Sequence, residues 1–519
     1  MNQGGTVTEL AALSRHSLVA VVGSGTMGEG IAQVAAVSGH PVILYDSRPG
    51  AVPVAIQNIH KNLQKLAQKK KLSCCEAEQA GSRLRAATRL EDLRSASLVI
   101  EAIVEDIDVK RRLFSDLESI VDRNCVLATN TSSLSVSAIA AGLRVPERLV
   151  GMHFFNPAPL MELVEIVGGV ASDPRALAQA HATALAWGKL PVDARSTPGF
   201  IVNRVARPYY AEALVLLSEQ AADPVTLDAV MREAGGFRMG PFELMDLVGL
   251  DVGLAVSQSL FTAFFGDARY RPSWIQQEMV RAGFLGRKTG RGFYSYSQTS
   301  TPPAPQTEPR ATAPLEVELP VGSRLADALE KRLAGSGVLV RRTNSQPPLE
   351  NRIVVSGASV ALTDGRTASQ RAYESGQVNF VVVDLALDFM TAARVAVSRA
   401  GTCDSQAYSS AVGLFQAAGF QVSPFKDVPG LAVARTVAML ANEAADAVNQ
   451  GVASAEAVDT AMRKGVNYPR GPIAWADDLG LPFVAAVLAN LARCYGGERY
   501  RVSPLIQHCR WSGKKLCEA

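Results

Sequence analysis

The chain has 519 residues, which is more than one ordinary domain holds and predicts roughly three domains. With 48% hydrophobic and 19% charged residues it has a globular composition, and its formal net charge of +3 gives no general attraction to nucleic acid or to a membrane. No apolar run approaches the ~18 residues of a membrane span, and residues 1–16 lack the pattern of a secretory signal. The seven cysteines have no metal-ligand spacing, so we expect a reduced, cytoplasmic protein without a metal site.

The first motif predicts a dinucleotide-binding turn. A short apolar run, typical of a buried parallel strand, leads into Gly23-Ser-Gly-Thr-Met-Gly, and a helical segment and a second strand follow. Gly23 would allow a tight turn, Gly25 the close approach of a pyrophosphate, and Gly28 the packing of helix against strand. Asp46 ends the second strand and would bind ribose hydroxyls, which favours NAD over NADP. The nearby Arg48 weakens that preference.

The next helical stretch is basic. Its apolar residues recur every three or four positions across 52–79, which predicts one buried face. Lys65, Lys69, Lys70 and Lys71 fall outside that face. Either they are simply solvated or they meet an anionic ligand, and the pattern alone favours the solvated surface.

Two further strands are predicted at 98–104 and 125–129, and the second runs into Asn130-Thr-Ser-Ser. Ligands of open α/β sheets bind at the carboxyl ends of the parallel strands. Ser132 is therefore a candidate for substrate contact. A serine at such a place can also cap the helix that follows, and this alternative stays open.

The stretch from Gly151 to Val167 holds the candidate catalytic pair. His153 ends one apolar strand and Glu165 lies within the next, and the prolines between them predict a turn that brings the two side chains together. A buried carboxylate is costly without a partner, and an imidazole is a natural one. Glu165 would orient His153 and stabilise its protonated form, so that His153 can act as a general base. The alternative is a core histidine near a strand-end glutamate.

The following stretches change in character. Residues 197–297 predict an all-helical domain, with a long apolar helix at 200–219 that carries Asn203. The stretch 298–314 is rich in Pro, Thr, Ser and Ala and predicts a linker. Residues 315–425 show two strand patterns, at 352–356 and 378–384, and helical patterns near 325–333 and 408–418, but no second glycine motif. We therefore predict a small α/β segment of degenerate Rossmann-like type with no nucleotide assigned.

Residues 426–519 repeat the helical domain. Asn203 corresponds to Ala434 in this repeat, so the second copy lacks that polar group. Either a surface position has drifted, or, as we favour, only the first copy serves an active site. A constant sequence offset predicts a duplicated domain, and it relates Pro198-Gly199 to Pro429-Gly430, Gly240-Pro241 to Gly471-Pro472, and Asp246 to Asp477.

The motifs GSGTMGEGIAQVAA (23–36), EAIVED (101–106), NTSSLSVSAIA (130–140), GMHFFNPAPLMELVEIV (151–167), TPGFIVNR (197–204) and GRKTGRGFY (286–294) are those of a known family. In these residues the sequence resembles the (S)-3-hydroxyacyl-CoA dehydrogenases. The C-terminal half is similar to the long bacterial form with a second helical domain, as in phenylacetate degradation. The resemblance implies NAD-dependent oxidation of (S)-3-hydroxyacyl-CoA to 3-oxoacyl-CoA, in β-oxidation-type or phenylacetate catabolism.

The resemblance also implies roles for single residues. His153 would remove the hydroxyl proton as hydride leaves C3 for the nicotinamide, and Glu165 would orient it. Ser132 and Asn203 would hydrogen-bond the reacting oxygen, and the basic helix lies where relatives bind CoA phosphates. The other family positions are Glu105, Lys110 and again Ser132 at the cofactor, and Asn156 at the substrate.

The expected fold class is an α/β Rossmann-like NAD-binding domain followed by all-helical domains. We expect NAD as cofactor, an acyl-CoA as substrate, no nucleic-acid or membrane partner, and helical copies that pack as an internal pseudo-dimer in a chain that could itself form a homodimer. A dehydrogenase of a free hydroxy or sugar acid and a non-catalytic NADH-binding protein remain as alternatives. The expected boundaries are 1–16 for an extension, 17–196 for the NAD-binding domain, 197–297 for the first helical copy, 298–314 for the linker, 315–425 for the small α/β segment and 426–519 for the second copy.

Overall fold

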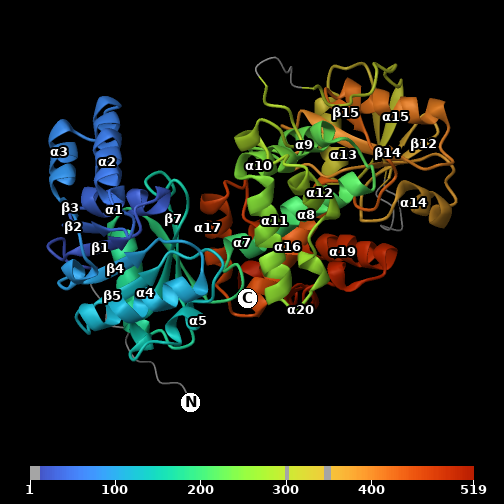
Figure 1. Cartoon of the computed structure of the whole chain (residues 1–519). Helices are drawn as coiled ribbons and strands as arrows, with labels where there is room; N and C mark the ends of the chain where they lie inside the picture. Colours follow the sequence, from blue (N-terminus) through green and yellow to red (C-terminus); the bar gives the residue numbers. More distant parts are fainter. Residues whose placement is uncertain (1–11, 298–302, 344–351, 519) are drawn as a thin grey trace. The chain divides into compact units, whose positions relative to one another are not determined.

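The computed structural model describes residues 12–297, 303–343 and 352–518 (Figure 1). Their contacts divide the chain into two compact units. Unit 1 holds the residues up to Arg204 together with Gln450–Val466, and unit 2 holds Val205–Asn449 and the residues from Asn467 onwards.

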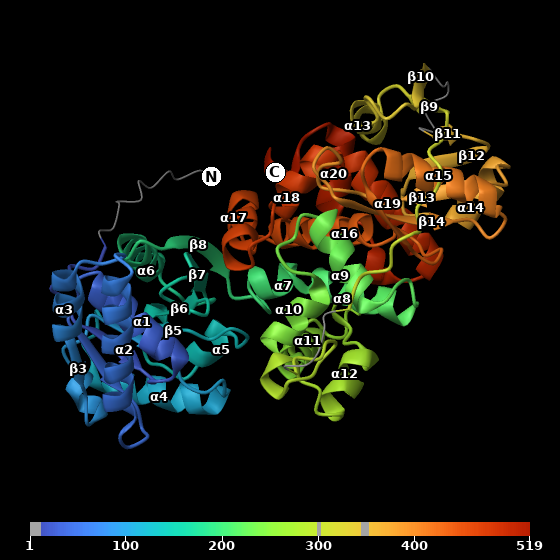
Figure 2. The ribbon, with the colours of Figure 1, turned by 90° about the horizontal axis from the view of Figure 1, so that it is seen from above.

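Unit 1 contains a sheet and the helices that cover it (Figure 2). Its strands are β1 (Val19–Val22), β2 (Val42–Tyr45), β3 (Leu84–Ala86), β4 (Leu98–Glu101), β5 (Val126–Thr129), β6 (Leu149–Phe154), β7 (Leu163–Gly168) and β8 (Leu190–Arg195). Its helices are α1 (Thr26–Val37), α2 (Ala51–Gln68), α3 (Cys74–Ser82), α4 (Ile107–Ile120), α5 (Val136–Ala140), α6 (Pro174–Ala186), the short α7 (Val202–Val205) at its boundary and α17 (Ala455–Gly465).

The eight strands of unit 1 follow the order β3-β2-β1-β4-β5-β6-β7-β8. Neighbours run parallel except β6 and β7, which are antiparallel. The strands β1, β4 and β5 are buried throughout, as expected of apolar runs inside a parallel sheet. Helices α1, α2 and α6 bury their apolar residues in one core with the sheet. This is the predicted Rossmann-like arrangement, and the carboxyl ends of β1, β4 and β5 face the place where ligands bind in such sheets.

Unit 2 contains helices from both copies and a second sheet. Its strands are β9 (Glu316–Pro320), β10 (Leu339–Thr343), β11 (Ile353–Val355), β12 (Ala358–Leu362), β13 (Phe380–Val383), β14 (Arg394–Arg399) and β15 (Gln421–Pro424), in the order β10-β9-β11-β12-β13-β14-β15. Its helices are α8 (Arg207–Ser218), α9 (Pro224–Glu233), α10 (Pro241–Val248), α11 (Leu250–Ala263), α12 (Trp274–Arg281), α13 (Arg324–Arg332), α14 (Ala368–Ser375), α15 (Ser405–Ala417), α16 (Val433–Asn449), α18 (Pro472–Leu479), α19 (Leu481–Tyr495) and α20 (Pro504–Ser512).

Two predicted helices are each broken in the structure. The stretch 52–79 forms α2 and α3, because Ser73 and Glu76 build a capping box that starts a new helix. The stretch 200–219 forms α7 and α8, because Pro208 stands in the first turn of α8 and has no N–H to continue the earlier helix.

The repeat extends beyond the helical copies into the sheets. The offset that relates Asp246 to Asp477 also relates β7 to β14 and α6 to α15 over their whole lengths, and it relates the start of β8 to that of β15. The pairing matches too, since β13 and β14 are antiparallel while β14 and β15 are parallel. The predicted small α/β segment is therefore shaped like the last part of the first sheet, and sequence patterns found only two of its strands.

The helical copies pack against each other inside unit 2, with α8 beside α16. Glu212 on α8 is fully buried and accepts a hydrogen bond from Arg435 Nε at 2.7 Å. Glu443 on α16, which the repeat relates to Glu212, accepts one from Tyr270 at 2.5 Å and one from Arg269 at 3.3 Å. Each copy thus supplies a buried glutamate to basic or phenolic groups of the other, which satisfies charges that burial alone would make costly.

A sharp bend recurs in both copies. Helices α10 and α11 meet at 98° around Gly249, and α18 and α19 meet at 100° around Gly480. Both glycines have φ near the left-handed region, 102° and 91°, which explains why the repeat retains glycine there. Among the described residues no single helix is long and apolar enough to cross a membrane. The two bent pairs reach the length and apolar composition of a membrane span only when both of their helices are counted together.

The predicted linker is partly packed. Residues 298–302 lie outside the described residues, but 303–314 run along the second sheet. Glu308 N donates to Val422 O at 2.8 Å, and Ala311 N donates to the Gln416 side chain at 2.8 Å. This part of the predicted linker is therefore an extended segment that is hydrogen-bonded to the second sheet and its helix α15.

Candidate active site

The turn between β1 and α1 has backbone contacts that only glycine permits. Gly23 has a φ of 102°, and a Cβ there would lie 2.4 Å from Ala102 O. A Cβ at Gly28 would lie 1.9 Å from Gly23 O. Gly25, in contrast, has open space around the position of a Cβ, and no side chain caps the helix that begins at Thr26. The first N–H groups of α1 are thus available, and this cradle fits a dinucleotide pyrophosphate.

Asp46 ends β2 beside this turn. Its Oδ2 accepts hydrogen bonds from Ser24 N at 2.9 Å and Ser24 Oγ at 2.7 Å, and its Oδ1 accepts one from Arg48 N at 2.9 Å. Burial opposes ionisation, but the bonds from Arg48 and Ser24 outweigh it and hold the pKa of Asp46 well below its usual range. The Arg48 guanidinium also pairs with Asp46 at 3.1 Å. The carboxylate is therefore charged at neutral pH, and the cation beside it is engaged by that carboxylate.

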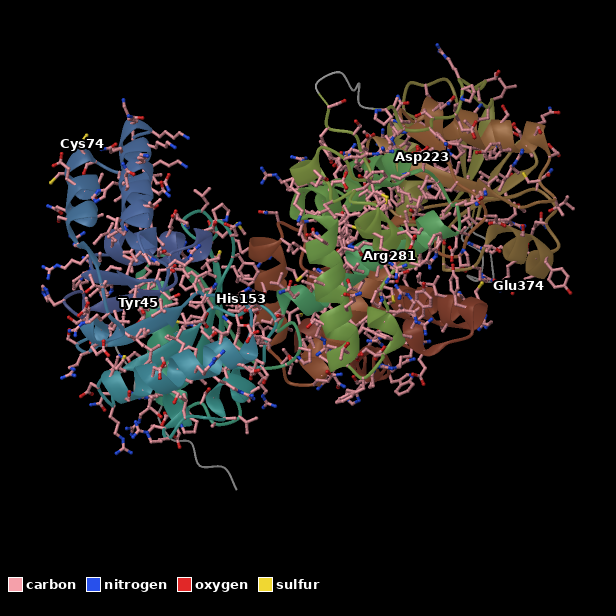
Figure 3. The ribbon with its side chains drawn as sticks, viewed as in Figure 1. Tyr45, Cys74, His153, Asp223, Arg281 and Glu374 are labelled. Carbon is pink, nitrogen blue, oxygen red and sulfur yellow. The ribbon has the colours of Figure 1, made fainter. Side chains whose placement is uncertain are left out.

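His153 and Glu165 lie side by side, as predicted, because β6 and β7 pair with these two residues directly opposite each other. Opposed residues of an antiparallel pair share one face of the sheet. His153 Nδ1 lies 2.6 Å from Glu165 Oε2. Glu165 is fully buried and His153 is 6% exposed (Figure 3 labels His153). A carboxylate can only accept, so Nδ1 carries the proton and Nε2 is left as the basic nitrogen.

The other oxygen of Glu165 is held by backbone. Ile201 N and Val202 N donate to its Oε1 at 3.1 and 2.9 Å, at the start of α7. Phe200, just before them, has a φ of 47°, a left-handed conformation that bulky residues seldom adopt. This strained turn aims two N–H groups at the carboxylate, and the ring of Phe200 lies 5.9 Å from that of His153.

Ser132 lies in a loop that Glu105 organises. Glu105 Oε1 accepts bonds from Thr131 Oγ1 at 2.5 Å, Ser132 N at 3.0 Å and Ser133 N at 3.1 Å. Burial would raise the pKa of Glu105, but the Thr131 bond and the charge of Lys110 lower it. The loop is thus pinned by an ionised carboxylate.

Asn203 reaches the same loop from α7. Its Nδ2 donates to Ser132 O at 3.2 Å. Asn130 ties the other end of the loop to β6, because its Oδ1 accepts from Phe154 N at 2.8 Å. The structure therefore brings Ser132, Asn203 and the strand that carries His153 into one hydrogen-bonded network.

Lys110 lies in the interior beside Glu105, which is also expected at the cofactor. Its side chain is 1% exposed, with Nζ 2.5 Å from Glu101 and 3.3 Å from Glu105. Glu101 also accepts a bond from Thr129 Oγ1 at 2.7 Å. Lys110 thus links Glu105, which holds the Ser132 loop, to Glu101 at the end of β4.

Asn156 and the basic helix lie apart from this network. Asn156 is exposed, and its side chain has no hydrogen bond among the described residues. The lysines of the basic helix, Lys65, Lys69, Lys70 and Lys71, are exposed as well, and none forms an ion pair within the described part of the chain. No group of three or more His, Cys, Asp or Glu side chains in that part could hold a metal ion.

Sequence reasoning missed Glu101 and Asn130. Glu101 carried a usable signal, because it is a carboxylate inside a buried strand, as Glu165 is. Asn130 carried none beyond its place in the Asn-Thr-Ser-Ser run, since its partner is a backbone N–H from another strand.

The second sheet has no dyad at the corresponding place. The repeat relates His153 to Asp384, and it relates Glu165 to the buried Ala396. Asp384 accepts from Ala432 N at 2.9 Å and Val433 N at 2.7 Å, which repeats the way Glu165 is held. Burial raises the pKa of Asp384 to about 6. One carboxylate thus keeps the helix-capping contact while the base is lost.

Comparisons with known proteins match most of the chain to one family. A model of the 3-hydroxyacyl-CoA dehydrogenase NAD binding domain matches residues 18–197. The C-terminal domain model of the same family matches twice, at 199–296 and 430–515. A model of the 3-hydroxybutyryl-CoA dehydrogenase reduced Rossmann-fold domain matches 360–429.

Similar proteins fall into long and short forms. The chain is 42% identical over 489 residues to 3-hydroxyadipyl-CoA dehydrogenase of Escherichia coli K12, covering 94% of this chain and 96% of that one. It is 40% identical over 280 residues to 3-hydroxybutyryl-CoA dehydrogenase of Clostridioides difficile, covering 54% of this chain and 99% of the relative. A crystal structure of 3-hydroxybutyryl-CoA dehydrogenase from Escherichia coli K12 superposes with a TM-score of 0.87 at 40% identity, covering 96% of this chain and 99% of that one.

Proposed function

The chain belongs to the 3-hydroxyacyl-CoA dehydrogenase family, NAD-dependent enzymes that oxidise 3-hydroxyacyl-CoA, and we propose that His153 and Glu165 perform its proton transfer. The observation that supports this most directly is the 2.6 Å contact of the two side chains at the end of β6. NAD, when bound, accepts the hydride that leaves C3 of the substrate.

His153 acts as the general base. Its Nδ1–H is donated to Glu165, so Nε2 takes the proton of the substrate hydroxyl as C3 is oxidised. The imidazolium that forms is stabilised by the carboxylate of Glu165, which two backbone N–H groups hold in place. In the reverse direction the same imidazolium returns the proton to the carbonyl oxygen.

Ser132 and Asn203 hold the reacting oxygen in this proposal. Charge develops on that oxygen during the reaction, and fixed donors lower its energy without reorganising. Support comes from the network that fixes both residues, with Asn203 bonded to the Ser132 carbonyl and the loop clamped by Glu105. Lys110, 3.3 Å from Glu105, keeps its expected place at the cofactor in this proposal.

We assign the CoA phosphates to the basic helix. Lys65, Lys69, Lys70 and Lys71 are exposed and offer four cations at one end of α2. Phosphates are drawn to such clusters, and the attraction weakens with salt. A free hydroxy acid would have no use for them.

We further propose that the paired helical copies replace, within one chain, a contact between two subunits. The match with the short relative from Clostridioides difficile covers 54% of this chain and 99% of the relative. The relative therefore has room for one helical copy only. Sedimentation of this protein across concentrations tests whether it needs a second chain.

The experiment follows NADH absorbance with acetoacetyl-CoA, 3-oxoadipyl-CoA and free acetoacetate at matched concentrations. NADH oxidation that requires a thioester supports the proposal. The ratio of the rates with the two thioesters then assigns the acyl group, because the relatives are named for both butyryl and adipyl substrates. Oxidation of free acetoacetate alone would refute it.

A further inference from the structure

Helix α17 belongs to the second helical copy but packs in unit 1, against β7 and β8 (Figure 1, Figure 2). The segment before it is bonded to the end of β8, since Arg195 N donates to Val452 O at 2.8 Å. At its other end Lys464 pairs with Glu162, the residue before β7, at 2.7 Å. Both ends of α17 are thus attached to the strand that carries Glu165 or to the next one.

The first copy makes the equivalent contact with the second sheet. Helix α9 contacts β14, and Lys426 N donates to Ala221 O at 2.9 Å. The repeat relates Arg195 to Lys426 and Ala221 to Val452, so the two backbone bonds correspond. The two copies are therefore exchanged: each covers the sheet of the other half, but only α17 meets a sheet that carries a dyad.

Gly465, the last residue of α17, faces the surroundings of His153. A Cβ there would lie 2.7 Å from Leu163 Cδ2, 3.1 Å from Val202 Cγ2 and 3.8 Å from Phe155 Cε1. The first distance is closer than real Cβ contacts, and the second is tighter than most. The ring of Phe155 in turn lies 4.5 Å from the ring of His153. A larger residue at 465 would push toward the base.

The same neighbours lead to Glu165. Val202 N is one of the two backbone donors to its Oε1, at 2.9 Å. Leu163 lies two residues before Glu165 on β7, and both are fully buried. The end of α17 therefore borders both members of the dyad through residues that are themselves packed and cannot move independently.

Glycine at this position is not explained by the helix itself. Glycine near a helix end is usually required by a left-handed backbone, but Gly465 at the end of α17 has no positive φ. The corresponding residue of the first copy is Ala234, which is buried and faces no dyad. The glycine is thus specific to the copy that borders the active site.

We propose that α17, through Gly465, is a positioning element of the active site, so that the second helical copy takes part in catalysis by the first half of the chain. The inference rests on the proposed function of His153 and Glu165. A displacement of about 1 Å in a catalytic group can cost roughly a hundredfold in rate, which a Cβ-sized intrusion can produce.

The test compares Gly465→Val with Ala234→Val, which places the same residue at the equivalent position of the first copy. We expect kcat to fall about a hundredfold in the first variant and less than threefold in the second, with the NADH dissociation constant and Tm similar in both. In the double variant Gly465→Val with Leu163→Ala, the smaller alanine makes room for the valine, so kcat should be at least tenfold higher than in Gly465→Val alone. Leu163→Ala by itself should not raise kcat.

A second readout reports on the dyad without turnover. The chain has six histidines, so selective ¹⁵N-histidine labelling resolves the Nδ1 proton of His153, identified by its loss in His153→Gln. Gly465→Val should shift this signal and Ala234→Val should leave it unchanged. Equal kcat in the two valine variants, with the signal unmoved in both, would overturn the inference. Wild-type kcat in His153→Gln would instead overturn the proposed function itself.

Discussion

Replacing Glu165 with glutamine removes one charge from the site and almost no volume. The carboxylate lies 2.6 Å from His153 Nδ1 in a fully buried position, so its charge faces the imidazolium directly. At an effective dielectric constant of about 20, two unit charges some 4 Å apart attract each other by about 4 kcal/mol. The amide also has one acceptor oxygen for donors that now occupy two, His153 on one side and Ile201 and Val202 on the other.

Loss of this attraction raises the barrier, because the imidazolium forms during the reaction. Because the amide of glutamine still presents a dipole to the imidazolium, only part of this attraction is lost. We expect kcat of Glu165→Gln to fall about 10²–10³-fold, at about 1.4 kcal/mol per factor of ten. Glu91→Gln, an exposed glutamate of unit 1, is the matched control and should retain wild-type kcat. NADH fluorescence titration and Tm establish that the variant binds cofactor and folds. A kcat of Glu165→Gln within threefold of the wild type would refute the reasoning.

Three further changes test other parts of the structure. Asp46→Ala removes the carboxylate that accepts from Ser24 and leaves Arg48 without its partner, so the ratio of kcat/KM for NADPH over NADH should rise at least tenfold, and an unchanged ratio would contradict the assignment. Glu105→Gln releases the clamp on the Ser132 loop and should lower kcat/KM about tenfold with Tm within a few degrees, measured with acetoacetyl-CoA. Burial raises the pKa of Asp228 to about 7 from 3.8, so the folded state binds this proton more tightly than the unfolded state does. Its contribution to the free energy of unfolding is therefore fully present below about pH 4 and is lost as pH rises toward 7, by at most on the order of 4 kcal/mol. Urea titrations should therefore show a free energy of unfolding that depends less on pH in Asp228→Asn than in the wild type.

The sequence predicted the parts of the site that local patterns encode. The glycine turn, Asp46 and the pairing of His153 with Glu165 each follow from a short motif or from two strands joined by a turn. The structure adds the register that places the pair directly opposite. The resemblance also supplied Ser132 and Asn203, whose roles remain proposals.

What the sequence could not supply depends on contacts between distant segments. Lys110 matched a family position at the cofactor, and its ion pairs with Glu101 and Glu105 in the interior are contacts that no motif reveals. Of the five strands missed in the second sheet, β10 and β12 have little alternation of polar and apolar residues, whereas β9 does alternate and was overlooked. The exchange of α9 and α17 between the halves could not be predicted either, because a repeat in sequence does not say which copy covers which sheet.

The exchange of helices has a consequence for how the chain is made. The ribosome finishes β8 at Arg195, but its backbone partner Val452 is added only after the whole of the first helical copy and the second sheet. At bacterial elongation rates of roughly 5–20 residues per second this interval lasts about ten seconds to almost a minute. During that time the sheet of unit 1 is complete while the side of β7 and β8 that α17 will cover is bare. The nascent NAD-binding half therefore stays uncovered on this side until α17 has been synthesised. A chaperone that binds exposed apolar strands during synthesis would bind there.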